Sequence, residues 1–241
     1  MKDARLIPEM AVGKRAKKLS LKPGLARTPR RKKGRMQSRR RRGFSLVELM
    51  VVIALILVVS GFSVMAIQPS LKEGHVTNGY NQTLTALRQA RDTAVAQRQI
   101  YFVTLNDAVF PNQITITQGS TGTVTASYFL PSDVIFVAWP GLPNSPLGFP
   151  RTPDGFGIGN VDIDFDQGIA GGIKNVIYFY PDGSAQDAVG NINNGVVYIA
   201  LAGDTRYVTT SRAITLWGAT GRLRGWRINL IPPATLYWRQ Q

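Results

Sequence analysis

The chain has 241 residues and a formal net charge of +15, and it contains no cysteine and a single histidine. The length suffices for one domain with a buried core, and the lack of cysteine excludes disulfides, thiolate zinc sites and Cys/His nucleophile pairs. The charge would suggest nucleic acid or an anionic membrane as a partner, but residues 1–43 hold all of the excess, so residues 44–241 are formally neutral.

The first 43 residues form a basic leader with scattered Pro and Gly and no sustained apolar period. Such a composition cannot bury a core, so we expect residues 1–38 to be disordered. The leader ends in four consecutive arginines at positions 39–42, directly before Gly43. Met36 offers a second start, and we expect that translation begins there.

An apolar stretch follows the leader. Residues 49–67 carry no charge, and at about 1.5 Å per helical residue they extend about 28 Å, close to the hydrocarbon thickness of a bilayer. We therefore predict a transmembrane helix at residues 44–67, with the basic flank in the cytoplasm. Glu48 is an acid inside this span, and it must lie at the headgroup level or find a partner, because a charge in hydrocarbon is costly.

A secretory signal peptide is the competing interpretation, since Val64-Met65-Ala66 resembles a cleavage site. The apolar run is longer than the roughly 7–15 residues of a signal core, and such a core does not usually carry a glutamate. We therefore prefer a membrane span that is retained.

The start of the span resembles a known signal. A basic run, Gly43, Phe44, Ser45, Leu46, any residue and Glu48, followed by an apolar helix, is similar to the type III signal of type IV pilins and of the pseudopilins of type II secretion. The resemblance implies that a prepilin peptidase cleaves after Gly43 and methylates the new amine of Phe44. It also implies that Glu48 pairs with the N-terminal charge of a neighbouring subunit in a fibre, and that the protein is held in the inner membrane with its C-terminal domain in the periplasm.

Residues 68–99 are predicted to form the amphipathic second half of the same long helix. Gln68-Pro69 and Gly74 predict a kink or short break, because proline lacks an amide donor and glycine raises the entropy cost of helix formation. A helical period returns from residue 77, with a weak, alanine-rich stripe that suits close packing on a sheet. The stripe consists of Leu84, Leu87, Ala90 or Arg91, Ala94 and Val95.

From residue 100 onward, short β-rich runs alternate with turn-forming residues such as Pro181-Asp182-Gly183 and Asn193-Asn194-Gly195. We therefore predict an α+β, type IV pilin-like fold, in which the long N-terminal helix packs on an antiparallel β domain at residues 100–241. The candidate strands are 100–105, 114–117, 123–130, 134–139, 176–180, 196–201, 207–210, 213–217 and 223–228.

Residues 140–160 are rich in proline and glycine, which forbids a central strand and predicts a long surface loop of the kind that often carries binding function. Gly155, Gly157 and Gly159 alternate with other residues, but their spacing is wrong for a nucleotide-binding loop and no helix follows.

The second half of the β region carries a further resemblance. A strand that ends in Pro181-Asp182-Gly183, a strand at 196–201 and a closing Gly221-Arg222-Leu223-Arg224 are similar to the GspH/FimT branch of minor pseudopilins and minor pilins. The similarity covers most of the chain except about residues 106–172. In FimT-type minor pilins the Gly-Arg-x-Arg turn is associated with DNA capture, which implies a role for Arg222 and Arg224 here.

The last part of the chain is basic. Six arginines and no acid follow Asp204, with tryptophans and tyrosines among them. Arginine binds phosphates and aromatic rings stack on bases, so Arg222, Arg224 and Arg227 are candidate DNA-binding residues. The alternative is that these arginines pair with the chain's own acids or with neighbouring subunits.

Asp162, Asp164 and Asp166 alternate with apolar residues, so in a strand they would share one face. A solvated strand face is the simpler interpretation and a cation site the alternative, since the spacing does not fit an EF-hand. His75 adjoins the span, where a solvated or interfacial position is expected, and it lies far in sequence from any serine in a strand. We expect no catalytic triad, no enzyme activity, no metal and no cofactor.

These observations predict a minor pseudopilin of a type II secretion system, a structural subunit in the assembly or capping of a pilus-like fibre. The expected partners are prepilin peptidase, other pseudopilins or pilins, and the inner membrane. The alternative is a FimT-like minor type IV pilin that binds DNA for uptake in natural transformation.

Overall fold

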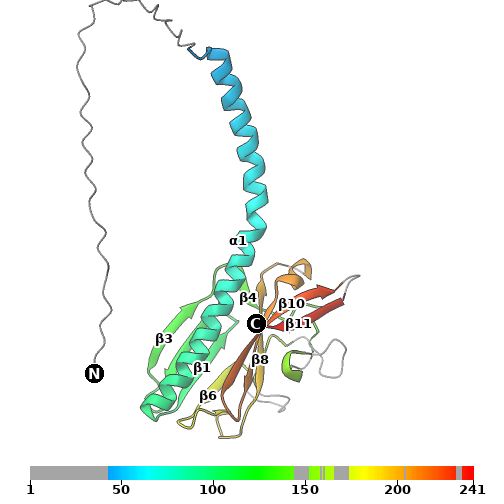
Figure 1. Ribbon diagram of the computed structural model, residues 1–241. Coiled ribbons are helices and arrows are strands. Elements are labelled where there is room, and N and C mark those ends of the chain that lie inside the picture. Colours follow the sequence, from blue (N-terminus) through cyan, green and yellow to red (C-terminus); the bar gives the residue numbers. More distant parts are fainter. Residues whose placement is uncertain are drawn as a thin grey trace, which may run out of the picture. The chain divides into compact units, whose positions relative to one another are not determined.

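The computed structural model describes residues 43–143, 152–157, 159, 161–165, 174–203, 205–231 and 235–241, except for the side chains of residues 64–66 and 205–207. Within these residues a long helix precedes a series of short strands and 3-10 helices (Figure 1). The elements are α1 (Leu46–Gln97), β1 (Tyr101–Asn106), β2 (Gln113–Gln118), β3 (Val124–Phe129), β4 (Val134–Phe136), η1 (Pro153–Gly155), β5 (Ile163–Asp164), β6 (Val176–Phe179), β7 (Ala185–Gln186), β8 (Gly195–Leu201), η2 (Thr205–Thr210), β9 (Arg212–Trp217), β10 (Arg222–Ile231) and β11 (Thr235–Gln240).

Helix α1 runs from Leu46 to Gln97 without interruption. The predicted break is therefore wrong, because the helix continues through Pro69 and Gly74. A proline inside a helix costs about 3 kcal/mol and removes one backbone hydrogen bond, which long helical flanks on both sides can offset. The two halves of the helix differ in burial, since the described side chains are exposed as far as Lys72 and buried positions begin at Val76.

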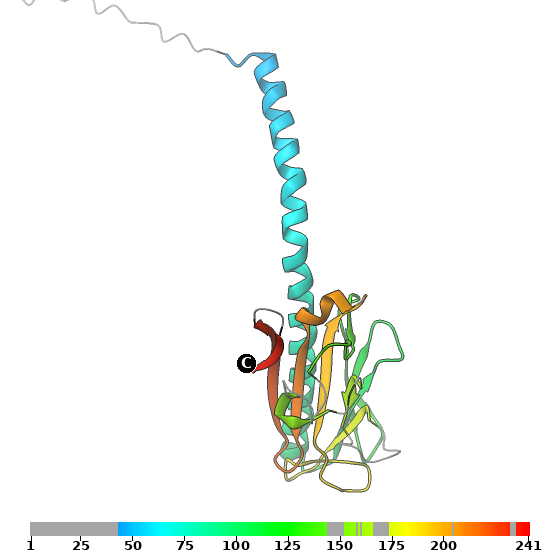
Figure 2. The same ribbon diagram turned by 90° about the vertical axis from the view of Figure 1, so that its right-hand side faces the viewer.

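Two antiparallel sheets follow the helix. One has the strand order β3-β2-β1-β6-β7, and the other has the order β11-β10-β9-β8-β4, with β5 also paired to β8. Figures 1 and 2 show the C-terminal half of α1 lying along the strands. A long N-terminal helix packed on an antiparallel β domain confirms the predicted α+β, type IV pilin-like fold.

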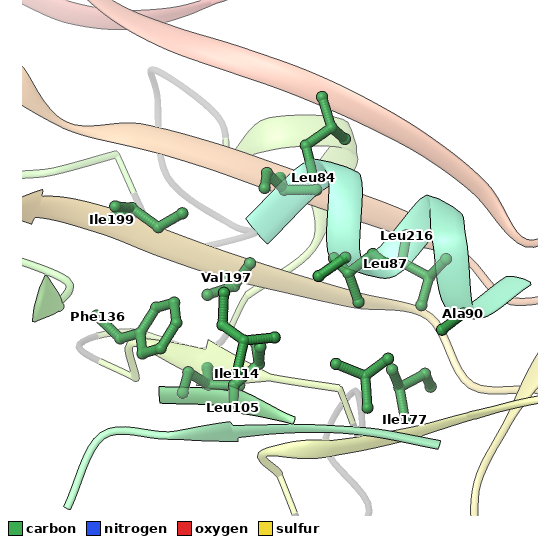
Figure 3. Packing of buried hydrophobic residues seen from close by; sticks show 14 of the residues in the cluster. Leu84, Leu87, Ala90, Leu105, Ile114, Phe136, Ile177, Val197, Ile199 and Leu216 are labelled. Carbon is green, nitrogen blue, oxygen red and sulfur yellow. The ribbon is translucent and has the colours of Figure 1, made fainter. Parts of the chain in front are cut away.

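Helix α1 and both sheets share one hydrophobic core. Leu84, Leu87 and Ala90 of α1 lie beside Ile177 of β6 and Val197 of β8 (Figure 3). Each fully buried leucine contributes about 1.5–3 kcal/mol relative to an exposed one, so this contact fixes the second half of the helix to the β domain.

The predicted helical stripe is largely confirmed. Leu84, Leu87, Ala90 and Ala94 are at most 9% exposed, whereas Val95 is 44% exposed. Val95 follows Ala94 directly and therefore lies about 100° further around the helix axis, away from the sheets. The prediction is correct for the members that are three or four residues apart, and it is wrong for Val95, which directly follows another member.

The buried face of α1 begins earlier than predicted. Val76, Tyr80 and Thr83 are buried, at spacings of four and three residues. Gly79 lies on the same face, where a Cβ atom would stand 3.0 Å from Val134 Cγ1. These positions were missed because the prediction placed an interruption just before them.

All but one of the predicted strands coincide with an observed strand. Residues 207–210 instead belong to η2, whose end is closed by a local hydrogen bond from Ser211 N to Val208 O at 3.2 Å. The prediction missed β5 and β7, which have two residues each and are too short to show alternation. It also missed β11, in which one central position is buried.

The sheet that contains β8 is covered on both faces, and every residue of β8 is buried. Tyr198 and Trp238 on the face away from α1 pack in a second cluster with Leu142 and Phe156 from the Pro/Gly-rich segment. Trp238 Nε1 donates a hydrogen bond to Pro143 O at 2.9 Å. The described parts of residues 140–160 therefore pack on the sheet rather than forming the free surface loop that was predicted.

Candidate functional site

The predicted processing site lies at the first residues that the structure describes. Gly43, Phe44 and Ser45 precede the helix, and Phe44 is 79% exposed. Ser45 O accepts the hydrogen bond from Leu49 N at 3.1 Å, so Ser45 caps the helix and Glu48 lies in the first turn. Serine at the cap with glutamate three residues later is the capping-box pattern.

Glu48 is placed to neutralise positive charge. The free amides of the first helical turn carry a partial positive charge, which a carboxylate in that turn offsets. Cleavage after Gly43 would add an ammonium group at Phe44, next to the capping residue. In apolar surroundings water cannot screen such charges, so an ammonium near this helix end requires the carboxylate of Glu48 or of a second subunit.

The first half of α1 is long and apolar enough to cross a membrane by its length and composition. Its described side chains are exposed, including large apolar residues from Leu46 to Leu71. The hydroxyl groups within it are satisfied internally, because Ser60 Oγ donates to Ile56 O at 2.6 Å and Ser63 Oγ donates to Val59 O at 2.9 Å. This surface must be covered by lipid or by other apolar helices.

Glu73 connects α1 to the second sheet. Its Oε1 lies 3.1 Å from Arg212 Nη2 and 2.5 Å from Arg227 Nη2. Arg212 is 3% exposed, and burial together with the neighbouring Arg227 lowers its pKa, while Glu73 acts in the opposite direction. Because an unpaired buried guanidinium would be strongly destabilising, Glu73 is a structural partner for both arginines.

Asp154 holds the Pro/Gly-rich segment on the opposite face of this sheet. Its buried carboxylate accepts hydrogen bonds from Arg224 Nη1 at 2.6 Å, Thr215 Oγ1 at 2.5 Å and Trp217 Nε1 at 3.1 Å. Trp226 Nε1 donates in turn to Thr215 Oγ1 at 2.9 Å. Asp154 has a φ of 54°, which residues with a side chain rarely adopt, and these contacts keep it there.

The candidate DNA-binding arginines do not share one surface. All three lie in β10, where alternation puts Arg222 and Arg224 on one face and Arg227 on the other. Arg224 is paired with Asp154 and Arg227 with Glu73, which confirms for these two the alternative that the arginines pair with the chain's own acids. Among the described residues, the guanidinium of Arg222 has no hydrogen-bond or ion-pair partner.

Arg91 of α1 binds two turns at once. Its Nε donates to Gly183 O at 3.2 Å in the β6–β7 turn, and its Nη2 donates to Thr220 O at 3.1 Å in the β9–β10 turn. Gly221 has a φ of 58°, and a side chain there would collide with Gly183 O. The Pro-Asp-Gly and Gly-Arg-x-Arg motifs are therefore neighbours in space, and the glycine of the second motif has a structural role.

A cleft of about 670 Å³ opens between α1 and the β9–β10 turn. Sequence reasoning missed the contribution of α1, because it considered Arg91 only as an alternative member of the helical stripe and gave Arg88 no binding role. Their spacing of three to four residues, which puts them on one helix face, is the signal that could have found them. The charged and aromatic residues of the cleft are Arg88, Arg91, Asp92, Trp217, Arg222 and Arg224.

The acidic run does not form the solvated strand face that was predicted. Asp164 lies in β5 and is fully buried, because β5 pairs with the central strand β8. Burial raises the pKa of Asp162, and Asp166 lies outside the described residues. No group of three acids or histidines that could hold a metal ion occurs among the residues that the structure describes.

His75 lies at the point where α1 enters the β domain. Its side chain is 52% exposed, as predicted, and its Nδ1 is 2.8 Å from Asp133 Oδ2 before β4. The pair adds a further polar contact between α1 and the β domain, near the one made by Glu73.

The continuous helix, its exposed apolar first half, the Gly-Phe junction before it and the antiparallel β domain together define a type IV pilin-like protein. Comparison with protein-family models agrees, because residues 38–64 match the prokaryotic N-terminal methylation motif. This motif implies processing by a prepilin peptidase and assembly with other pilins, and proteins that carry it are generally structural, membrane-anchored subunits. Comparisons with curated proteins and with solved structures found no significant match.

Proposed function

We propose that this protein is a minor pseudopilin, a structural subunit that a type II secretion system builds into a pilus-like fibre. The observation that supports this most directly is the methylation motif at residues 38–64 followed by a helix whose apolar first half is uncovered. An uncovered apolar helix can be stored in a bilayer and then transferred to a bundle of similar helices without exposure to water.

In this proposal the precursor crosses the inner membrane once, with the leader in the cytoplasm and the β domain in the periplasm. The peptidase cleaves after Gly43 and methylates the amine of Phe44. Glu48 then pairs with the amine of an adjacent subunit, so that two charges in apolar surroundings neutralise each other. The pairing favours one position of the incoming subunit along the fibre axis over the adjacent positions.

The choice of a minor subunit of the GspH/FimT branch is supported by the β domain. The two turn motifs that carry the resemblance meet at Arg91, and the glycine of the second is required by its close approach to Gly183. Motifs held together in this way are a coherent structural unit rather than two chance matches.

DNA uptake is the second candidate function. The cleft that contains Arg222 and Arg224 is in its favour. Against it, the carboxylates of Asp154 and Glu73 already bind Arg224 and Arg227, and Arg227 lies on the other face of the strand. Phosphate binding needs free cations, so we prefer secretion. A secretion operon around the gene would agree with this preference, and a competence cluster would reverse it.

Fibre incorporation tests the proposal. In cells that assemble the fibre from its other subunits, Glu48→Gln should insert in the membrane normally but fall on the order of tenfold in the sheared fibre fraction, because an ammonium loses its charged partner. Asp107→Asn is the control, since it removes an exposed acid that lies outside the helix and outside both hollows beside it. Equal amounts of the Glu48→Gln and unmodified chains in the fibre would refute the assigned role of Glu48.

A further inference from the structure

We infer that the cleft between α1 and the β9–β10 turn docks a carboxylate-bearing segment of a partner subunit, with Arg88 and Arg222 as its binding residues. The inference rests on the proposed function in one respect, namely that the partner is another fibre subunit. It assigns a role to these two arginines, which form no ion pair with the described residues.

Arg88 and Arg222 line one cleft from two different elements. Arg88 projects from α1 and Arg222 from β10, both are exposed, and neither guanidinium has a partner among the described residues. Arg224 also lines the cleft, and its Nε is buried and has no hydrogen-bond acceptor among the described residues. A guanidinium presents a planar set of donors that matches a carboxylate, so the cleft offers several donors to one incoming acid.

The cleft is suited to an elongated ligand. A second hollow of about 650 Å³ lies along the outer face of α1 and shares Arg88 and Asp92 with the first. It is lined by small polar side chains such as Thr85 and Thr93, and Gln89 in its wall is held by Tyr128 Oη at 2.6 Å. An extended peptide with one acid at Arg88 and Arg222 would fit the two hollows together.

A protein carboxylate fits this surface better than a nucleic acid. Asp92 stands in the wall of both hollows with 75% of its side chain exposed, and it would repel a chain of phosphates more than a single acid. Arg224 lies over the ring of Trp217 at 5.6 Å from its centroid, which occupies a face that a base would need for stacking. The few free cations of the cleft, and a tryptophan ring with one face already covered, favour a single carboxylate over a nucleic acid.

The test uses the full chain, co-expressed with prepilin peptidase and purified in detergent. Mass spectrometry first records whether residues 1–43 have been removed, and a failure at this step contradicts the proposed function alone. Binding of acetylated, amidated hexaglutamate is then followed by tryptophan fluorescence, with Trp217→Phe defining the part of the signal that comes from the cleft. All variants share the same N-terminus, so the leader cannot produce differences between them.

We expect Arg88→Gln/Arg222→Gln to weaken hexaglutamate binding on the order of tenfold, because charged hydrogen bonds are lost. Asp92→Asn should strengthen binding about two- to fivefold, because the repulsion is removed. Arg239→Gln, an exposed arginine of β11 that does not line the cleft, should leave binding unchanged.

Three results would overturn the inference. Hexaglutamine could bind as tightly as hexaglutamate, which would show that the carboxylates play no part in binding. Arg239→Gln could weaken binding as much as the double variant, which would indicate only general charge attraction. A single-stranded oligonucleotide of equal charge could bind more tightly than hexaglutamate through Arg88 and Arg222, which would assign the cleft to nucleic acid.

Discussion

Glu73 and Asp154 together bind three of the arginines that form one basic cluster in the sequence. Glu73 reaches Arg212 and Arg227 from α1, and Asp154 reaches Arg224 from the Pro/Gly-rich segment on the opposite face. The strand order brings acids from more than sixty residues away in sequence to these positions. Charge clustering in sequence therefore overstates the charge that a ligand would meet on the folded surface.

Loss of the Glu73 carboxylate should leave Arg212 buried with only neutral acceptors. We expect Glu73→Gln to lower the free energy of unfolding by about 2 kcal/mol, a value below that of a fully buried pair because Glu73 is half exposed. Asp92→Asn, which removes an exposed acid paired with Arg91 at 3.7 Å, should change it by less than about 0.5 kcal/mol. Denaturant unfolding of the full chain in detergent measures both, and similar values for the two variants would contradict the structural role of Glu73.

At the scale of elements, the position of α1 on the sheet that contains β10 depends on the close contact between Tyr80 and Gly225. Tyr80 is 6% exposed, and a Cβ atom at Gly225 of β10 would overlap its hydroxyl group. Burial raises the pKa of Tyr80, with Arg88 and Arg212 acting in the opposite direction. This contact lies between the Arg91 and Glu73 contacts in the sequence of α1, so the helix is held to the β domain at successive points.

Gly225→Ala should therefore move the helix or the strand and lower the free energy of unfolding by about 1–3 kcal/mol. Adding Tyr80→Phe should recover part of this loss, because it removes the overlapping oxygen. Gly74→Ala is the control of opposite sign: nothing lies within 4 Å of its Cβ position, and alanine favours a helix by about 0.5–1 kcal/mol over glycine. Destabilisation by Gly74→Ala, or none by Gly225→Ala, would contradict this account of the helix contact.

Local signals predicted much of the fold. The apolar run, the stripe at Leu84 and Leu87 and the β-branched runs reflect periodicities that any window of the sequence reveals. Three features depend on distant partners and could not be predicted: the continuity of α1 at Pro69, the pairing of β5 with β8, and the docking of Asp154 on β9 and β10. The arginine cleft could not be predicted for the same reason, since Arg88 and Arg222 come together only after folding.

At the scale of the whole molecule, the sequence divides into a charged leader, an apolar half-helix and a neutral remainder. All of the net charge of +15 precedes residue 44, and the described apolar side chains of the first half of α1 are exposed among the residues that the structure describes. This division suits the proposed function, in which the leader stays on one side of the membrane and the helix lies first in lipid and then in a bundle of helices. In the proposed function, the transfer of the helix from lipid to the bundle requires that the leader be removed at one defined bond.

Mass spectrometry of the chain expressed with and without prepilin peptidase tests this claim most directly. With the peptidase, the chain should lose residues 1–43 and begin at a Phe44 that carries one added methyl group. Gly43→Ala should reduce the cleaved fraction strongly, whereas Gly61→Ala, inside α1, should leave it unchanged. An identical mass with and without the peptidase would contradict the assignment of this protein as a processed, type IV pilin-like subunit.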